Sequence, residues 1–145
     1  MESSPPRHVI GGQWLNADEH GHVKLRASED ARTRSRWFPP LESIGTETDL
    51  PKVEIGPRGV AYASTVVRVG AARFEPPYVL TYVDVDGVRV LAHSPGQVPL
   101  APGTPVELVL ARVGVNAVTD GGKTGEPPAE LWSYTATPVA EGAEQ

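Results

Sequence analysis

The sequence contains no cysteine, so a disulfide framework and any metal site built on thiolates are excluded. Long apolar runs are also missing: no stretch approaches the ~20 residues of a membrane-spanning helix, and residues 1–12 lack an apolar signal-peptide core. We therefore expect a cytoplasmic protein with no membrane partner. Basic charge is scarce as well, with 13 Lys and Arg against 18 Asp and Glu. A net charge of −5 argues against nucleic acid as the main partner, because binding the phosphate backbone needs a basic face.

Glycine and proline are abundant, with 15 of each among 145 residues, which favours short strands and turns over helices. Residues 14–25 have a weak pattern, and the charged stretch 26–36 is expected to lie on the surface. From residue 52 onward, apolar and polar residues alternate in segments rich in Val, Tyr and Thr, as in strands. These segments are 52–55, 60–69, 78–85, 88–92, 106–113 and 131–139, and Asp86-Gly87 is a hairpin signal.

Five or six such strands predict an all-β fold, and a small barrel is our preferred architecture. An immunoglobulin-like sandwich is the alternative, because the number of strands hardly separates the two.

Several short motifs, in order over residues 25–113, resemble a known family. They are Phe38-Pro39-Pro40, Gly59 to Val67, Pro77 to Leu80 followed by Val83 to Val85, Gly87 to Ala92, and Leu100 to Leu108. In this order they resemble the acyl-CoA-associated OB-fold proteins, thiolase-accessory proteins that carry an N-terminal rubredoxin-like zinc ribbon. The resemblance implies an OB-fold barrel over residues 51–140, preceded by an N-terminal tail and ribbon-like segment in 1–50 and followed by a tail in 141–145.

The zinc ligands of the family are missing from this sequence. The family's cysteine positions fall on Asp30 and Thr33 before the Phe-Pro-Pro corner, and on roughly Ile44 and Glu47 after it. An isoleucine cannot coordinate a metal, so we expect a degenerate, metal-free ribbon and no zinc. Such a segment must be held by packing of Trp37 and Phe38 or by a partner.

The resemblance also implies a function. Members bind thiolase-like enzymes that form or cleave carbon–carbon bonds or transfer acyl groups in lipid metabolism. We expect a non-catalytic accessory subunit in a hetero-oligomeric complex, because a chain without cysteine cannot supply the thiolase nucleophile. We expect no catalytic residues and no tightly bound cofactor. Contact with a coenzyme A thioester in the complex, and a homodimer, stay open.

Two groups of residues are candidate ligand contacts. Arg32, Arg34 and Arg36 could bind coenzyme A phosphates or an acidic patch on the partner, since Arg binds phosphate in a bidentate manner. The alternative is a solvated charged loop. Trp37 and Phe38 could line an acyl or pantetheine tunnel, or instead form a minor core that covers the barrel edge.

The candidate partner interface is the segment with Phe74, Pro76, Pro77 and Tyr78, a proline-restricted aromatic loop with Phe74 as its main anchor. The alternative is an ordinary strand entry with Tyr78 packed inward. His20 and His22 are weak evidence for a metal site, because no third ligand is evident.

Two other functional classes stay in view. An OB-fold module could bind single-stranded nucleic acid or another ligand, but 6% aromatic residues and a negative charge disfavour nucleic acid. A free-standing enzyme with a barrel cavity would need a nucleophile, metal set or acid–base pair that the sequence does not show.

Overall fold

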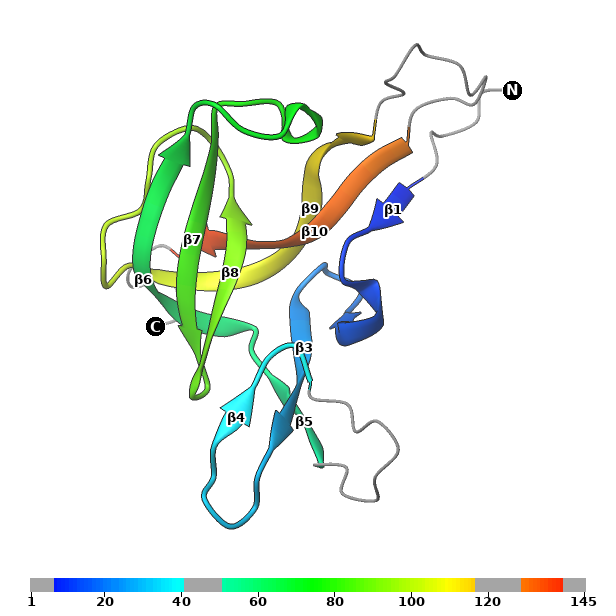
Figure 1. Ribbon diagram of the computed structural model, residues 1–145, viewed down its shortest axis with the longest axis vertical. Coiled ribbons are helices and arrows are strands. Elements are labelled where there is room, and N and C mark those ends of the chain that lie inside the picture. Colours follow the sequence, from blue (N-terminus) through cyan, green and yellow to red (C-terminus); the bar gives the residue numbers. More distant parts are fainter. Residues whose placement is uncertain (1–6, 41–50, 117–128, 140–145) are drawn as a thin grey trace.

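Five strands in the second half of the chain close into a barrel in the computed structural model, which describes residues 7–40, 51–116 and 129–139 (Figure 1). These strands are β6 (Arg58–Val67), β7 (Tyr78–Val85), β8 (Val88–Ser94), β9 (Pro105–Asn116) and β10 (Ala129–Pro138). They neighbour one another in the order β6-β7-β8-β10-β9, and β9 pairs with β6 to complete the circuit. The β8–β10 pairing is parallel and the others are antiparallel. This is the five-stranded Greek-key barrel of the OB-fold, which confirms the predicted fold class over a sandwich.

The β7–β8 hairpin shows how the sequence encodes the barrel wall. Asp86 (φ 46°) and Gly87 (φ 87°) form its turn, and positive φ at both positions is the geometry that an Asp-Gly hairpin favours. Every second residue of β7 and β8 faces the core, so Val83 and Val85 are fully buried. The intervening residues form the outer face of the sheet.

The first barrel strand depends on Gly59. A Cβ at this position would lie 2.8 Å from both the carbonyl oxygen of Asp84 and a methyl of Val83, so the close β6–β7 approach excludes a side chain. A β-bulge between Ala61 and Ala63 then shifts the register, and Tyr62 projects from the barrel surface.

The N-terminal part forms a second, smaller sheet around β3 (Val23–Glu29). Its neighbours are β2 (Leu15–Ala17), β4 (Arg36–Trp37) and β5 (Lys52–Ile55), all antiparallel to β3. The expected start of the barrel domain, residue 51, lies just before β5. In the structure β5 pairs with β3 and so belongs to the N-terminal sheet. Before β2, β1 (Arg7–Val9) runs parallel to β10 and is followed by the 3-10 turn η1 (Gly12–Trp14). Figure 1 shows this sheet extending below the barrel, with β1 beside the end of β10.

The two sheets share one hydrophobic core. Leu25 of β3 and Ile55 of β5 are fully buried in the same cluster as Val85 and Leu108 of the barrel. The N-terminal sheet is therefore packed onto the barrel. Within the described ranges, the chain has no helix of the length and hydrophobicity needed to cross a bilayer.

Hydrogen bonds close the β3–β4 turn at the positions where the family has its first cysteine pair. The Asp30 carboxylate accepts the Arg32 amide at 2.9 Å, and the Thr33 hydroxyl accepts the Ser35 amide at 3.2 Å. Ile44 and Glu47 lie outside the described residues. In 7–40, 51–116 and 129–139, no three His, Asp or Glu side chains gather as a metal site would require.

Candidate partner-binding face

The outer face of β6, β7 and β8 exposes four large hydrophobic side chains. Val60 is 45%, Tyr62 51%, Tyr82 47% and Leu91 43% exposed. Strand register aligns them, since Tyr82 lies between Ala63 of β6 and Leu91 of β8. A shallow groove of about 320 Å3 runs over this surface, lined by Ala63, Ser64, Thr65, Leu80, Tyr82 and Leu91. We call this surface, from Val60 and Tyr62 to Tyr82 and Leu91, the outer face.

One edge of the outer face carries a stacked polar group. The Arg89 guanidinium lies 3.4 Å from the centre of the Tyr62 ring and makes two hydrogen bonds to the Asp84 carboxylate, at 2.7 and 3.2 Å. The hydrogen bond from Arg89 lowers the pKa of Asp84, so this exposed pair is ionised near neutral pH. Stacking on Arg89, which the two hydrogen bonds to Asp84 fix in turn, holds the Tyr62 ring in place.

The loop between β6 and β7 adds an aromatic cluster at the other end of these strands. Phe74, in the 3-10 turn η2 (Ala72–Phe74), packs edge-on against Tyr78 at 5.5 Å and His93 at 4.6 Å between ring centres. Burial lowers the pKa of His93, so its imidazole is neutral near neutral pH. Phe74, Pro76, Pro77 and Tyr78 are all only part-exposed. The predicted interface loop is thus folded against β8.

A second apolar hollow lies where the N-terminal segment meets the barrel. We call it the Trp14 pocket; its volume is about 310 Å3. It meets the groove of the outer face at Leu80 and Leu91, which line both. Its other main walls are Ile10, Trp14, Phe74, His93 and Tyr134.

The three candidate arginines do not act as one patch. Arg36 is part-buried, pairs with Glu29 at 3.3 Å and donates to the backbone oxygen of Asp86 at 2.7 Å. Arg32 and Arg34 are exposed on the β3–β4 turn. The structure therefore joins Arg36 to the barrel, whereas Arg32 and Arg34 lie on the exposed turn.

The two candidate aromatic residues of this region separate in the same way. Trp37 is 37% exposed, whereas Phe38 packs edge-on against both Trp14 and Tyr134, each with 6.0 Å between ring centres. Phe38 thus has the arrangement of a core cover at the barrel edge.

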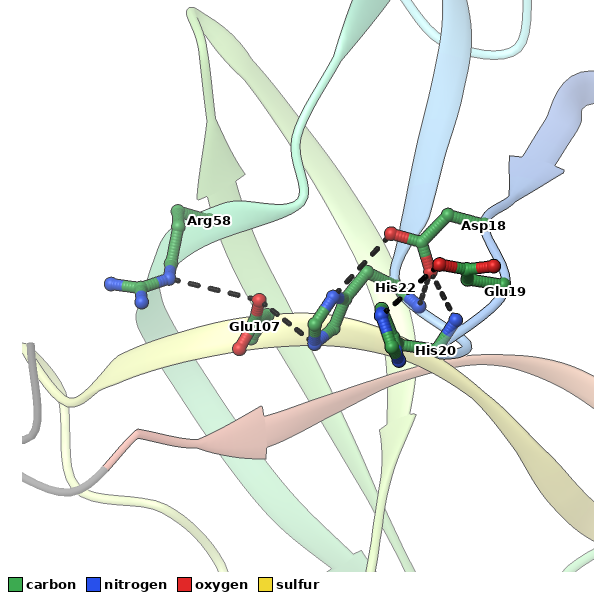
Figure 2. Close-up of polar contacts among 6 residues, drawn as sticks. All are labelled: Asp18, Glu19, His20, His22, Arg58 and Glu107. Carbon is green, nitrogen blue, oxygen red and sulfur yellow. Dashed lines mark hydrogen bonds and ion pairs between the residues drawn. The ribbon is translucent and has the colours of Figure 1, made fainter.

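The two histidines of the β2–β3 turn lie in a polar cluster (Figure 2). His22 Nδ1 is 3.5 Å from the Asp18 carboxylate, and His22 Nε2 is 3.3 Å from Glu107 of β9, which is also 3.8 Å from Arg58. Because the two carboxylates contact opposite nitrogens of one ring, they share no point where an ion could sit. This cluster ties the turn to the barrel.

The residues that dominate the outer face, Tyr62, Tyr82 and Leu91, were not among the predicted site residues. The sequence does contain a signal for the pairing of Tyr82 with Leu91. The Asp86-Gly87 turn sets Val85 opposite Val88, and the same register places Tyr82 opposite Leu91. The exposure of Tyr62 follows from the bulge, which has no comparable signal. Trp14 and Tyr134 come together only through tertiary packing.

Comparisons with known proteins agree with this architecture. Residues 52–111 match the family model described as ChsH2, C-terminal OB-fold domain. A chain of the solved structure described as "Ltp2-ChsH2(DUF35) aldolase" superimposes with a TM-score of 0.51 at 21% sequence identity, covering 77% of this chain and 84% of that one. At this identity, the likeness shows a common fold. No curated protein matches the sequence significantly. The family model begins at residue 52, so the ribbon-like part of the resemblance stays a prediction.

Proposed function

We propose that this chain is a non-catalytic accessory subunit that docks a thiolase-like, acyl-CoA-handling enzyme on its outer face. The match of residues 52–111 to the family described as ChsH2, C-terminal OB-fold domain supports the OB-fold part of the resemblance from which acyl-CoA chemistry is expected. The solved structure with the same fold has a name that joins ChsH2(DUF35) to a second protein, Ltp2, and to an aldolase. Absence of cysteine means that a thiolase nucleophile would have to come from the partner.

The observation that carries the proposal is the outer face itself. Tyr62, Tyr82 and Leu91 are each more than 40% exposed on a rigid sheet, and tyrosine and arginine are the residue types most enriched at interface hot spots. Rigid aromatic side chains lose little entropy on binding. The Arg89 cation at the edge is already neutralised by Asp84, so the face suits an apolar protein surface better than a phosphate backbone.

The test is co-expression with the thiolase-like enzyme encoded nearest to this chain, affinity capture through a tag on this chain, and sizing of the product. We expect a stoichiometric hetero-oligomer. Tyr82→Asp should weaken it by at least about tenfold, because a carboxylate would be desolvated at the centre of the interface. Val98→Asp is the matched control, since Val98 is 75% exposed in the loop after β8 and does not line the groove of the outer face.

Separate elution of the two wild-type proteins would overturn the proposal, as would equal loss of binding in Tyr82→Asp and Val98→Asp. A homodimer that Tyr82→Asp dissociates, with no enzyme bound, would assign the outer face to self-association instead.

A further inference from the structure

The lining of the Trp14 pocket, like that of the groove on the outer face, contains no residue with a formal charge. Its residues come from β1–η1, the η2 loop, β7, β8 and β10. A volume of about 310 Å3 lies at the lower end of the range of small-molecule sites, roughly 300–1,000 Å3. The lining also follows the usual pattern of such sites, with mostly apolar walls and very few polar groups.

The polar groups at the pocket are few and uncharged. The Ser133 hydroxyl donates to the backbone oxygen of Ile10 at 3.4 Å and is therefore occupied. Burial raises the pKa of Tyr134 and lowers that of His93, so both side chains stay neutral near pH 7. Among the described residues His93 makes ring contacts with Phe74 and Tyr78. A neutral imidazole has one donor and one acceptor, and it can therefore hydrogen-bond a carbonyl or hydroxyl.

These features select against charged ligands. An ionised carboxylate placed in this pocket would lose its hydration without gaining a cation. An acyl chain attached through an ester or thioester keeps the apolar chain and the carbonyl but has no such charge.

We propose that the Trp14 pocket binds the medium-length acyl chain of a neutral ester or thioester, with the chain against Trp14 and Leu80 and the carbonyl near His93. This site belongs to the chain itself and does not depend on the docked enzyme. The pocket shares Leu80 and Leu91 with the groove of the outer face, but Tyr82 lines only the groove.

Tryptophan fluorescence tests the proposal directly, because the pocket contains one of the three tryptophans. Trp37→Phe with Trp132→Phe leaves Trp14 as the only indole. Bromine quenches an indole only at close range, so the full chain with this background is titrated with the methyl ester of ω-bromodecanoic acid and, separately, with the free acid at pH 7. We expect saturable quenching by the ester and at least tenfold weaker quenching by the ionised acid.

Two further variants, made in the same background, locate the bound ester. Ile10→Asp puts a carboxylate in the pocket wall and should abolish saturable quenching, whereas Val98→Asp should leave it unchanged.

Wild-type protein gives an independent readout, since the ester should shift the NMR signals of the His93 ring. Linear, non-saturable quenching, or saturable quenching that Ile10→Asp leaves intact, would overturn the proposal. Tyr82→Asp should keep the quenching while losing the enzyme, so failure of the pocket and failure of the docking face can be told apart.

Discussion

Gly114 offers a sharp test of how the loop that carries Phe74 is held. It lies in β9 beneath the η2 turn, and the two elements are in direct contact. A Cβ on residue 114 would overlap the carbonyl oxygen of Arg73 and lie 3.0 Å from its carbonyl carbon and 3.1 Å from the Phe74 Cα. These are backbone atoms, so no rotamer change can relieve the overlap. Gly114→Ala must therefore displace the turn, and with it the Phe74 ring.

The size of the effect follows from the contacts that would be lost. Phe74 makes edge-on contacts with Tyr78 and His93, and each aromatic pair contributes about 0.5–1.5 kcal/mol beyond its buried area. Losing both costs about 1–3 kcal/mol. Replacing Gly by Ala recovers up to about 1 kcal/mol by restricting the unfolded chain. We expect a net destabilisation of about 1–2 kcal/mol, together with a local change at His93.

Equilibrium urea unfolding measures the first quantity, and the NMR signals of the His93 ring report the second, because they feel the ring current of Phe74. Gly12→Ala is the matched control: its Cβ would meet Val9 side-chain atoms at 3.4 and 3.5 Å, which is ordinary contact. It should change stability by no more than about 0.5 kcal/mol. If Gly114→Ala behaves like this control and leaves the His93 signals in place, the proposed packing of η2 on β9 is wrong.

Two other predictions concern buried polar groups. The Thr81 hydroxyl, fully buried, links those of Ser64 at 2.9 Å and Ser94 at 2.8 Å, and Ser64 also accepts the Leu100 amide at 3.0 Å. Thr81→Val should therefore cost about 2 kcal/mol in urea unfolding, mainly because it removes the hydroxyl partner of the buried Ser94. Thr81→Ser keeps the link and should cost only about 1 kcal/mol, and equal losses would contradict this account. Burial lowers the pKa of His93 below its ordinary 6.5, so the unfolded chain takes up a proton more readily. Its contribution to stability is complete above about pH 6.5 and is lost as the pH falls through the native pKa, so acid should destabilise wild type more than His93→Gln. If the unfolding free energies of wild type and His93→Gln change in parallel with pH, this account of His93 is wrong.

The barrel could be predicted because its strands carry their signals locally. Alternation and the Asp86-Gly87 turn set the β7–β8 hairpin, and the structure confirms both. The N-terminal sheet could not be predicted from local alternation and turn signals. The stretch 26–36 looked like a surface segment, yet β3 continues to Glu29 and buries Ala27 completely. Its charged residues Lys24 and Arg26 alternate with buried ones, and its residues pair with β5 residues that are 24 to 30 positions away in sequence.

The candidate site shows the same division between local and tertiary signals. Phe74 was predicted as a partner-interface anchor because an aromatic residue close to two prolines is conspicuous. The structure places it in the wall of the Trp14 pocket, and its role at an interface stays a prediction. Trp14 and Tyr134 were missed because nothing in either segment indicates the other, and they come together only when η1 and β10 both pack against Phe38.

Side-chain burial and local hydrogen bonds explain how the N-terminal sheet is held on the barrel. Leu25 and Ile55 bury their side chains in the barrel core, and the turn at Asp30 is closed by its own hydrogen bonds. Burial of large aliphatic side chains stabilises by about 1.5–3 kcal/mol each, so several of them can hold the segment against the barrel.

The proposed ligand site depends on this packing. Ile10 and Trp14 are contributed by the N-terminal segment, and His93 and Leu80 by the barrel, so the pocket exists only while the two are packed together.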